Sequence, residues 1–202
     1  AHVVARIYHE SARSLLLIGG ALFILVALNA DDFFKLLPEG YSEGARITKV
    51  VALGALINMV TGVNYPILTN SHKYVWGSVF LVLLLAFTIL GNLILLPSWG
   101  ILGPAIAACC ASIVYNGLKF EFIRRAFKLQ PFDANTFKQV LLIAACYAIG
   151  ANIPLDLGPI SAILVRSLVV CGIYLGATVV MGTVADLYHH VPKRWSRMLP
   201  KK

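Results

Sequence analysis

The sequence predicts an all-α, polytopic membrane protein with six transmembrane helices and both termini in the cytoplasm. Three observations support this prediction: the composition, one long uncharged segment and the distribution of basic residues. Of the 202 residues, 59% are hydrophobic and only 13% are charged. Soluble domains carry about 25% charged residues. The composition is therefore that of a membrane protein.

The clearest predicted span is Trp76–Leu96, which contains no charged side chain. As a helix rising about 1.5 Å per residue it reaches about 30 Å, which matches the hydrocarbon core of a bilayer. Trp76 lies at one end, where an indole ring favours the headgroup layer. The alternative, a buried helix of a soluble protein, is disfavoured because other segments of the chain have the same character.

Six apolar segments in all are predicted to span the membrane. They are Ser14–Ala30, Ile47–Leu68, Trp76–Leu96, Gly100–Leu118, Phe137–Ile153 and Gly158–Gly182. Short turns at Pro97–Gly100 and Asn152–Gly158 make the helices on either side antiparallel neighbours. We divide the chain into residues 1–136, with four spans and a basic interfacial segment, and residues 137–202, with the final pair of spans and a basic tail.

The basic residues indicate the orientation in the membrane. Six spans place thirteen of the seventeen Lys and Arg residues on one side, and the positive-inside rule assigns that side to the cytoplasm. The thirteen are Arg6, Arg13, Lys73, Lys119, Arg124, Arg125, Lys128, Lys138, Lys193, Arg194, Arg197, Lys201 and Lys202; Lys35, Arg46 and Lys49 fall on the other side. Residues 119–138 mix basic and aromatic side chains and are predicted to form an interfacial helix on anionic lipid headgroups. Nucleic acid is not an expected partner, since this segment is short and tethered at both ends.

Polar side chains along the second predicted span make it the most informative segment for function. Asn58, Thr61, Gly62, Tyr65 and Thr69 follow helical spacing and would share one face of a continuous helix. A polar stripe in a membrane span must face protein or water. It either lines a polar passage or forms hydrogen bonds between helices. We take Asn58, Thr61 and Tyr65 as candidate substrate-binding residues.

Arg166 is a further candidate, because it is the one charged residue well inside an apolar segment. A guanidinium at that depth is costly unless it pairs, meets water or extends to the interface. Its planar set of donors suits an anionic group such as a lipid-linked diphosphate. Extension to the nearer interface is the alternative, and the neighbouring spans show no acidic partner.

Several kinds of chemistry have no motif in this sequence. There is no GxxxxGK[ST] nucleotide motif, no HExxH, no GxSxG and no carboxylate pair within a span. The four cysteines fall in apolar segments without metal-ligand spacing. We therefore expect neither an enzyme, nor a cofactor, nor a metal.

The order of the segments resembles a known family. LLPEGY ends the first helix and its loop, TGVNYPILTNS follows in the second, and a very apolar span leads to LPSWGILGPAIAACCASIVYN and the basic KFEFIRRAFKLQPF. Over about Arg13–Lys138 this series is similar to the C-terminal half of bacterial polysaccharide-biosynthesis flippases. These belong to the multidrug/oligosaccharidyl-lipid/polysaccharide exporter superfamily. The turn LPSWGILGPAIA is the most recognisable piece.

The resemblance implies a fourteen-helix, two-lobe transporter of the bacterial inner membrane, of which this chain supplies the last six helices. Its partners would be membrane lipid, the lipid-linked substrate and the remaining N-terminal helices. It implies movement of undecaprenyl-diphosphate-linked oligosaccharide by alternating access. A start at Ala1 with no signal-peptide pattern agrees with the C-terminal part of a longer protein or a shortened form of one. The alternatives are a cation-coupled multidrug antiporter of the same superfamily, and a membrane scaffold or lipid-processing enzyme subunit.

Overall fold

The computed structural model describes residues 2–61, 63–154 and 157–182, and these residues form only helices and connections. The basic tail predicted from the sequence lies outside the described residues. The α-helices are α1 (His2–Phe34), α2 (Gly44–Val60), α3 (Asn64–Thr69), α4 (Val75–Trp99), α5 (Leu102–Phe127), α6 (Ala134–Ala151) and α7 (Pro159–Val180), with a 3-10 turn at Glu39–Tyr41. The prediction of an all-α fold is confirmed for the described residues.

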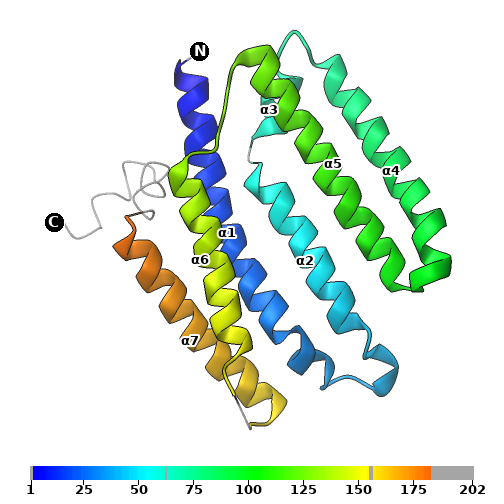
Figure 1. Ribbon diagram of the computed structural model, residues 1–202, viewed down its shortest axis with the longest axis vertical. Coiled ribbons are helices and arrows are strands. Elements are labelled where there is room, and N and C mark those ends of the chain that lie inside the picture. The colour runs from blue at the N-terminus through cyan, green and yellow to red at the C-terminus, as the bar shows by residue number, and fades with distance from the viewer. Residues whose placement is uncertain (1, 62, 155–156, 183–202) are drawn as a thin grey trace.

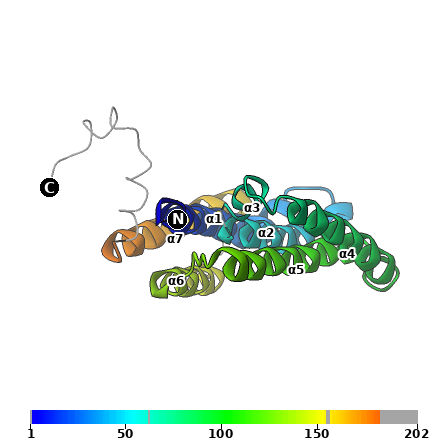
Figure 2. The ribbon, with the colours of Figure 1, turned by 90° about the horizontal axis from the view of Figure 1, so that it is seen from above.

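The long helices stand side by side and alternate in direction (Figure 1). α1 and α2 pack together near the middle; α6 and α7 cover one side of α1, and α5 and then α4 extend the other side. Seen from above, this makes the molecule much wider than it is thick (Figure 2). One core cluster joins α1, α6 and α7, and another joins α3, α4 and α5. A thin arrangement of this kind leaves many apolar side chains at the surface.

Five helices are long and apolar enough to cross a membrane: α1, α4, α5, α6 and α7. The segment predicted as the second span is instead broken into α2, of 17 residues, and α3, of 6 residues. Pro66 explains the break, because its ring would clash with the carbonyl four residues earlier in a continuous helix. In the structure Pro66 falls in the first turn of α3, where a missing N–H is tolerated. The prediction of one continuous helix here is wrong.

α5 runs without interruption to Phe127, so residues 119–127 of the predicted interfacial helix are the last part of α5, and residues 134–138 are the start of α6. No proline or turn signal separates Leu118 from Phe127, and helical hydrogen bonding simply continues. A helix of 26 residues reaches about 39 Å, which exceeds a hydrocarbon core of about 30 Å. The excess length would allow Arg124 and Arg125, in the last turn of α5, to reach beyond such a core.

α4 and α5 form a close hairpin, as the small residues of α5 predict. Gly100 turns the chain with a positive φ of 57°. Gly103 then lies directly against the backbone of Leu95 and Leu96, and Gly91 lies against Ala107. By contrast, Gly172 and Gly176 on α7 face open space within the described residues. A GxxxG pair of this kind suits the close approach of another helix, and no helix among the described residues occupies that position.

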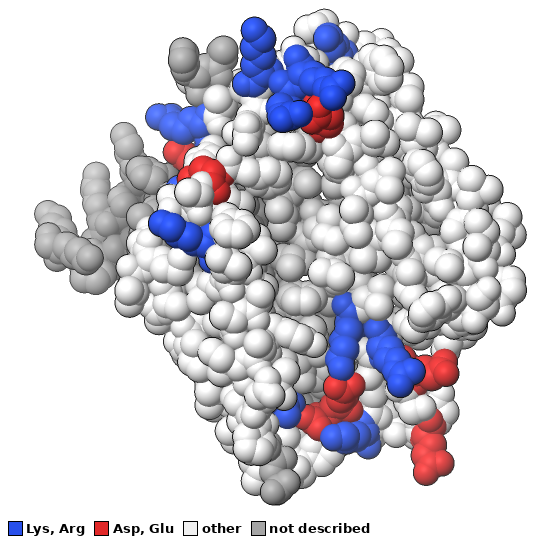
Figure 3. Space-filling view, viewed as in Figure 1, with Lys and Arg blue, Asp and Glu red and all other residues white. Residues whose placement is uncertain are grey.

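Charged side chains gather at the two ends of the molecule, with a broad uncharged band between them on the face shown in Figure 3. Among the described residues, the end where α1 begins carries eight basic and three acidic residues, and the opposite end carries four of each. The first set is Arg6, Glu10, Arg13, Lys73, Lys119, Glu121, Arg124, Arg125, Lys128, Asp133 and Lys138; the second is Asp31, Asp32, Lys35, Glu39, Glu43, Arg46, Lys49 and Arg166. We call the first the basic end. Two charged ends and an apolar belt are what a bilayer requires.

Asp133 begins α6 and ties it to α1 at the basic end. Its carboxylate accepts hydrogen bonds from the backbone N–H and the hydroxyl of Thr136, at 2.8 and 2.9 Å. His9 of α1 donates from Nδ1 to the carbonyl of Pro131 at 2.7 Å, and its Nε2 lies 3.4 Å from Asp133. Burial opposes ionisation, but the bonds from Thr136 and the charges of Arg13 and His9 hold the pKa of Asp133 below its usual value.

We expect Gly103→Ala to destabilise the protein by about 1–3 kcal/mol, because the added Cβ would overlap backbone of α4 that cannot move aside. The matched control is Gly117→Ala in the same helix, where a Cβ meets nothing within 4 Å. Unfolding in mixed micelles, followed by circular dichroism, measures both. Equal stability of the two variants would contradict the close packing of α4 on α5.

We expect Asp133 to make the free energy of unfolding depend on pH. This free energy should fall as the pH drops from about 3.9, the ordinary pKa of aspartate, through the lower pKa that Asp133 has in the folded protein. The folded state favours the ionised carboxylate, so its contribution is present above that range and is lost below it. Asp133→Asn keeps a capping side chain and should remove this part of the pH dependence. Asp133→Ala should cost about 1 kcal/mol at neutral pH. An unchanged pH profile in Asp133→Asn would contradict this role.

Candidate functional site

Hydrogen bonds between neutral side chains fill the space beside the break between α2 and α3. The side chain of Asn116 on α5 accepts from the hydroxyl of Thr61 at 3.0 Å and donates to Oδ1 of Asn58 at 2.5 Å. Thr61 also donates to the backbone carbonyl of Asn58 at 3.1 Å. Asn116 is the fifteenth of the 26 residues of α5, so the cluster lies near the middle of the molecule's height. We call Asn58, Thr61 and Asn116 the amide cluster.

A second polar contact holds the start of α3. The hydroxyl of Tyr8 on α1 donates to Oδ1 of Asn64, and both side chains are buried. The Nδ2 of Asn64 is also buried and has no partner in the described structure. On α5, the buried Lys119 places Nζ 3.9 Å from the ring centroid of Tyr115, a cation–π contact. The buried polar side chains of α1, α3 and α5 are thus close to the break between α2 and α3.

Tyr65 does not join the amide cluster. Its side chain is 41% exposed, and only its backbone carbonyl is engaged, by the hydroxyl of Thr69 at 3.0 Å. Because the helix is interrupted, Asn58 and Tyr65 do not share the face that the spacing predicted. Gly62, which was placed on the same face, lies outside the described residues.

Arg166 forms a buried ion pair with Asp32, 2.5 Å from Nη1 to Oδ2, and donates to the carbonyl of Leu28 at 3.2 Å. The two side chains are only 14% and 9% exposed. Lys35 contacts the other oxygen of Asp32 at 2.7 Å. The absence of an acidic partner, inferred from the sequence, is therefore wrong. α1 extends beyond the predicted boundary at Ala30, so its last turn carries Asp32 against α7.

Arg166 keeps donor capacity beyond this ion pair. Its Nε is buried without a partner in the described structure, and so is Oδ1 of the neighbouring Asn29. The amide nitrogen of Asn29 donates to Ser167 of α7 at 2.9 Å, beside the ion pair. A guanidinium with a free Nε–H can donate one more hydrogen bond, for example to an oxygen of a phosphate.

The predicted site residues therefore fall into separate places. Asn58 and Thr61 meet in the amide cluster, Tyr65 lies at the surface, and Arg166 lies at the end opposite the basic end. Along α1, Tyr8, which contacts Asn64, and Leu28, which contacts Arg166, are about 30 Å apart at the helical rise, and the amide cluster lies at a height between them. Sequence reasoning missed Asn116 and Asp32. A lone Asn among the small residues of α5, and an Asp just past an apolar segment, were the available signals.

The arrangement offers hydrogen bonds and one spare cationic donor. Within the ranges that the structure describes, no group of three or more His, Cys, Asp or Glu side chains could hold a metal ion. Neutral amides and hydroxyls exchange hydrogen bonds with polar ligands such as sugar hydroxyls. The two regions together suit a ligand with a polar part and an anionic part.

No family model, curated protein or solved structure matches the chain.

We expect Asp32→Asn to destabilise the protein by about 3 kcal/mol, because it leaves the Arg166 charge buried and without a carboxylate. Arg166→Gln should cost less, since Lys35 still neutralises Asp32. The double variant should be more stable than Asp32→Asn alone. Unfolding of the two single variants and the double variant forms a double-mutant cycle, and additive losses would contradict a coupled pair.

Proposed function

We propose that this chain forms the C-terminal six-helix part of a fourteen-helix, two-lobe transporter in the bacterial inner membrane. The transporter flips undecaprenyl-diphosphate-linked oligosaccharide by alternating access. The observation that carries the proposal is the broken α2–α3 segment with buried polar side chains beside it, in a chain with two charged ends and an apolar belt. Broken helices with polar groups near the middle of the membrane are common at transporter binding sites.

The broken segment supports a sixth crossing. α2 starts at the end opposite the basic end, and α3 leads to the turn before α4 at the basic end (Figure 1). From Gly44 to Thr69 the segment has as many residues as α5. With this crossing, the starts and ends of the described helices alternate sides as the basic residues require, and the basic end faces the cytoplasm.

In the proposed mechanism, Asn58 and Thr61 contribute hydrogen bonds to the sugar portion when the cavity opens, and Tyr65 contributes from its exposed position. Arg166 binds an oxygen of the diphosphate through the donors that Asp32 leaves free. Because Lys35 already contacts Asp32, the carboxylate remains neutralised when Arg166 turns to the substrate. The exchange of Arg166 between Asp32 and the substrate then accompanies the change between the two faces of the membrane.

The surface of the chain also agrees with a part of a larger membrane assembly. Large apolar side chains are exposed along α4 and α7, for example Leu93 at 68% and Leu168 at 74%. The same surfaces serve equally for contact with acyl chains and with the eight helices that the resemblance places before this chain.

A second candidate is a cation-coupled antiporter of the same superfamily. Such a protein needs a carboxylate inside the membrane that can exchange a proton or a cation. Asp32, only 9% exposed in its side chain and held by two cations, is a carboxylate of this kind at the end of α1. Asp32 therefore supports the antiporter, whereas the sequence shows no carboxylate pair within a predicted span.

We expect the protein to move a fluorescent undecaprenyl-diphosphate-linked oligosaccharide across proteoliposome membranes, followed by quenching from the outside. The triple variant Asn58→Ala, Tyr65→Phe, Arg166→Gln should reduce the rate at least tenfold, because about 1.4 kcal/mol of lost binding to the moving substrate is enough for that factor. The transporter that carries this chain is used in full.

The matched control is Asn152→Ala, Tyr74→Phe, Lys49→Gln, which changes the same numbers of amides, hydroxyls and charges at other positions. Its transport should equal that of the unchanged protein. Full transport by the triple site variant would remove the proposed site. Export of cationic drugs with no movement of the lipid-linked substrate would favour the antiporter.

A further inference from the structure

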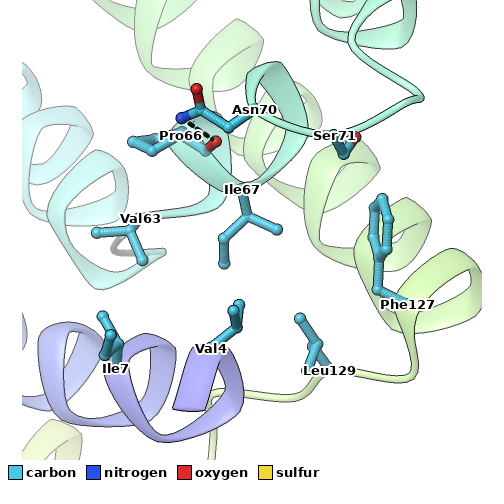
Figure 4. Close-up of a pocket in the computed structure, with 9 residues that line it drawn as sticks. All are labelled: Val4, Ile7, Val63, Pro66, Ile67, Asn70, Ser71, Phe127 and Leu129. Atoms are coloured by element: carbon cyan, nitrogen blue, oxygen red, sulfur yellow. Dashed lines mark hydrogen bonds between the residues drawn. The ribbon is translucent and has the colours of Figure 1, made fainter. Parts of the chain in front are cut away.

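An apolar cavity of about 520 Å³ opens at the basic end between the start of α1, α3 and the end of α5 (Figure 4). Val4 and Ile7 of α1 form one wall, and Val63 and Ile67 form the facing wall. The cavity is far from the Arg166 ion pair, at the other end of α1. Its volume falls in the usual range for small-molecule sites, about 300–1,000 Å³.

The third wall comes from the point where α5 ends. Phe127 and Leu129 line the cavity, and Lys128 between them has a positive φ of 54°. This left-handed residue ends α5 and turns the chain so that Leu129 folds back over the cavity. Asn70 and Ser71 complete the edge beyond α3. The cavity is therefore apolar inside and polar at one edge.

Lys73 stands at that polar edge, where its backbone N–H donates to the hydroxyl of Ser71 at 3.1 Å. Lys73 places Nζ 5.9 Å from the ring centroid of Phe127, and Lys128 adjoins the two lining residues of the third wall. Within the described part of the chain neither lysine pairs with a carboxylate, whereas Glu121 is taken up by Arg124 and Arg125 and Glu10 by Arg6. The edge therefore presents uncompensated positive charge next to an apolar space.

We propose that this cavity binds an anionic phospholipid of the cytoplasmic leaflet. One acyl chain lies between Ile7 and Ile67, and the phosphate is held at Lys73 and Lys128. Two features together select this ligand: the apolar walls take a hydrocarbon chain, and the cations complement a phosphate that carries net charge. A zwitterionic lipid offers the same chain but less charge for the edge.

The position of the site suits that ligand. The cavity lies beside the last turn of α5, which extends beyond the hydrocarbon core to the level of the headgroups. A bound lipid would contact α1, α3 and α5 at once and so hold the short α3 in place between the break and the basic end. This inference does not depend on the proposed transport function, because none of its residues belongs to the proposed substrate site.

The test is native mass spectrometry of the whole chain in micelles, titrated with phosphatidylglycerol or with phosphatidylcholine of the same acyl chains. We expect one phosphatidylglycerol to bind at least tenfold more tightly than phosphatidylcholine. Each lysine near a charged lipid contributes about a fivefold effect, so Lys73→Gln with Lys128→Gln should remove the preference. The control, Lys35→Gln with Arg46→Gln at the other end, should keep it.

A second pair of variants tests the cavity itself. Ile67→Trp, and separately Val4→Trp from the facing wall, should abolish the tight phosphatidylglycerol adduct, while Leu22→Trp in the groove between α1 and α2 should not. Circular dichroism confirms that each variant keeps its helices, and Val4, 43% exposed, accepts a larger side chain without repacking. Equal binding of the two lipids, or an unchanged phosphatidylglycerol preference in both Trp variants, would overturn the proposal.

Discussion

The requirement that backbone polar groups be satisfied where water is absent governs this structure. Long helices meet it automatically, and five of the described helices are long and apolar enough to cross a bilayer. At the break between α2 and α3, hydrogen bonds within the helices do not satisfy all of the backbone polar groups. Side chains supply hydrogen bonds there. The hydroxyl of Thr61 donates to the carbonyl of Asn58, and the side chain of Asn116 on α5 bonds to the side chains of Asn58 and Thr61. The amide cluster is thus a consequence of the break, and it is also what makes the break a candidate binding region.

The same requirement explains the two kinds of polar contact in the molecule. Near the middle of its height the polar groups are neutral and bond to one another, because a charge there has no compensation from solvent. Charges appear toward the ends, and where one is drawn inward it has a partner: Arg166 has Asp32, and Lys119 has the ring of Tyr115. Under the proposed function, this separation of neutral and charged groups by depth would provide two different contacts, one for a sugar part and one for a diphosphate part.

Much of the fold could be predicted because the signals are local. The length of a segment without charged residues identified α4, and the short turn at Pro97–Gly100 identified its antiparallel pairing with α5. The errors also have local causes. The segment containing Pro66 was predicted as one continuous helix, but the clash of the proline ring with the preceding turn ends α2. Residues 119–127 were separated from α5 by their charge, although helical hydrogen bonding does not depend on hydropathy. Of the candidate site, Asn58 and Thr61 were placed together correctly, but Tyr65 was placed on a face that the break removes.

The sequence by itself determined the apolar, helical character of this protein, the approximate position of the five helices long enough to cross a membrane, and the end that carries most of the basic residues. These properties depend on the composition of each segment and on the spacing of its hydrophobic residues, and both can be read from the segment alone. Only the tertiary structure decided that Asn116 completes the amide cluster, that Asp32 compensates Arg166, and that Val4, Ile67 and Phe127 enclose one cavity. The partners in each case are far apart in the chain, on helices whose rotation about their own axes is fixed by packing with neighbours, and no local pattern specifies that rotation.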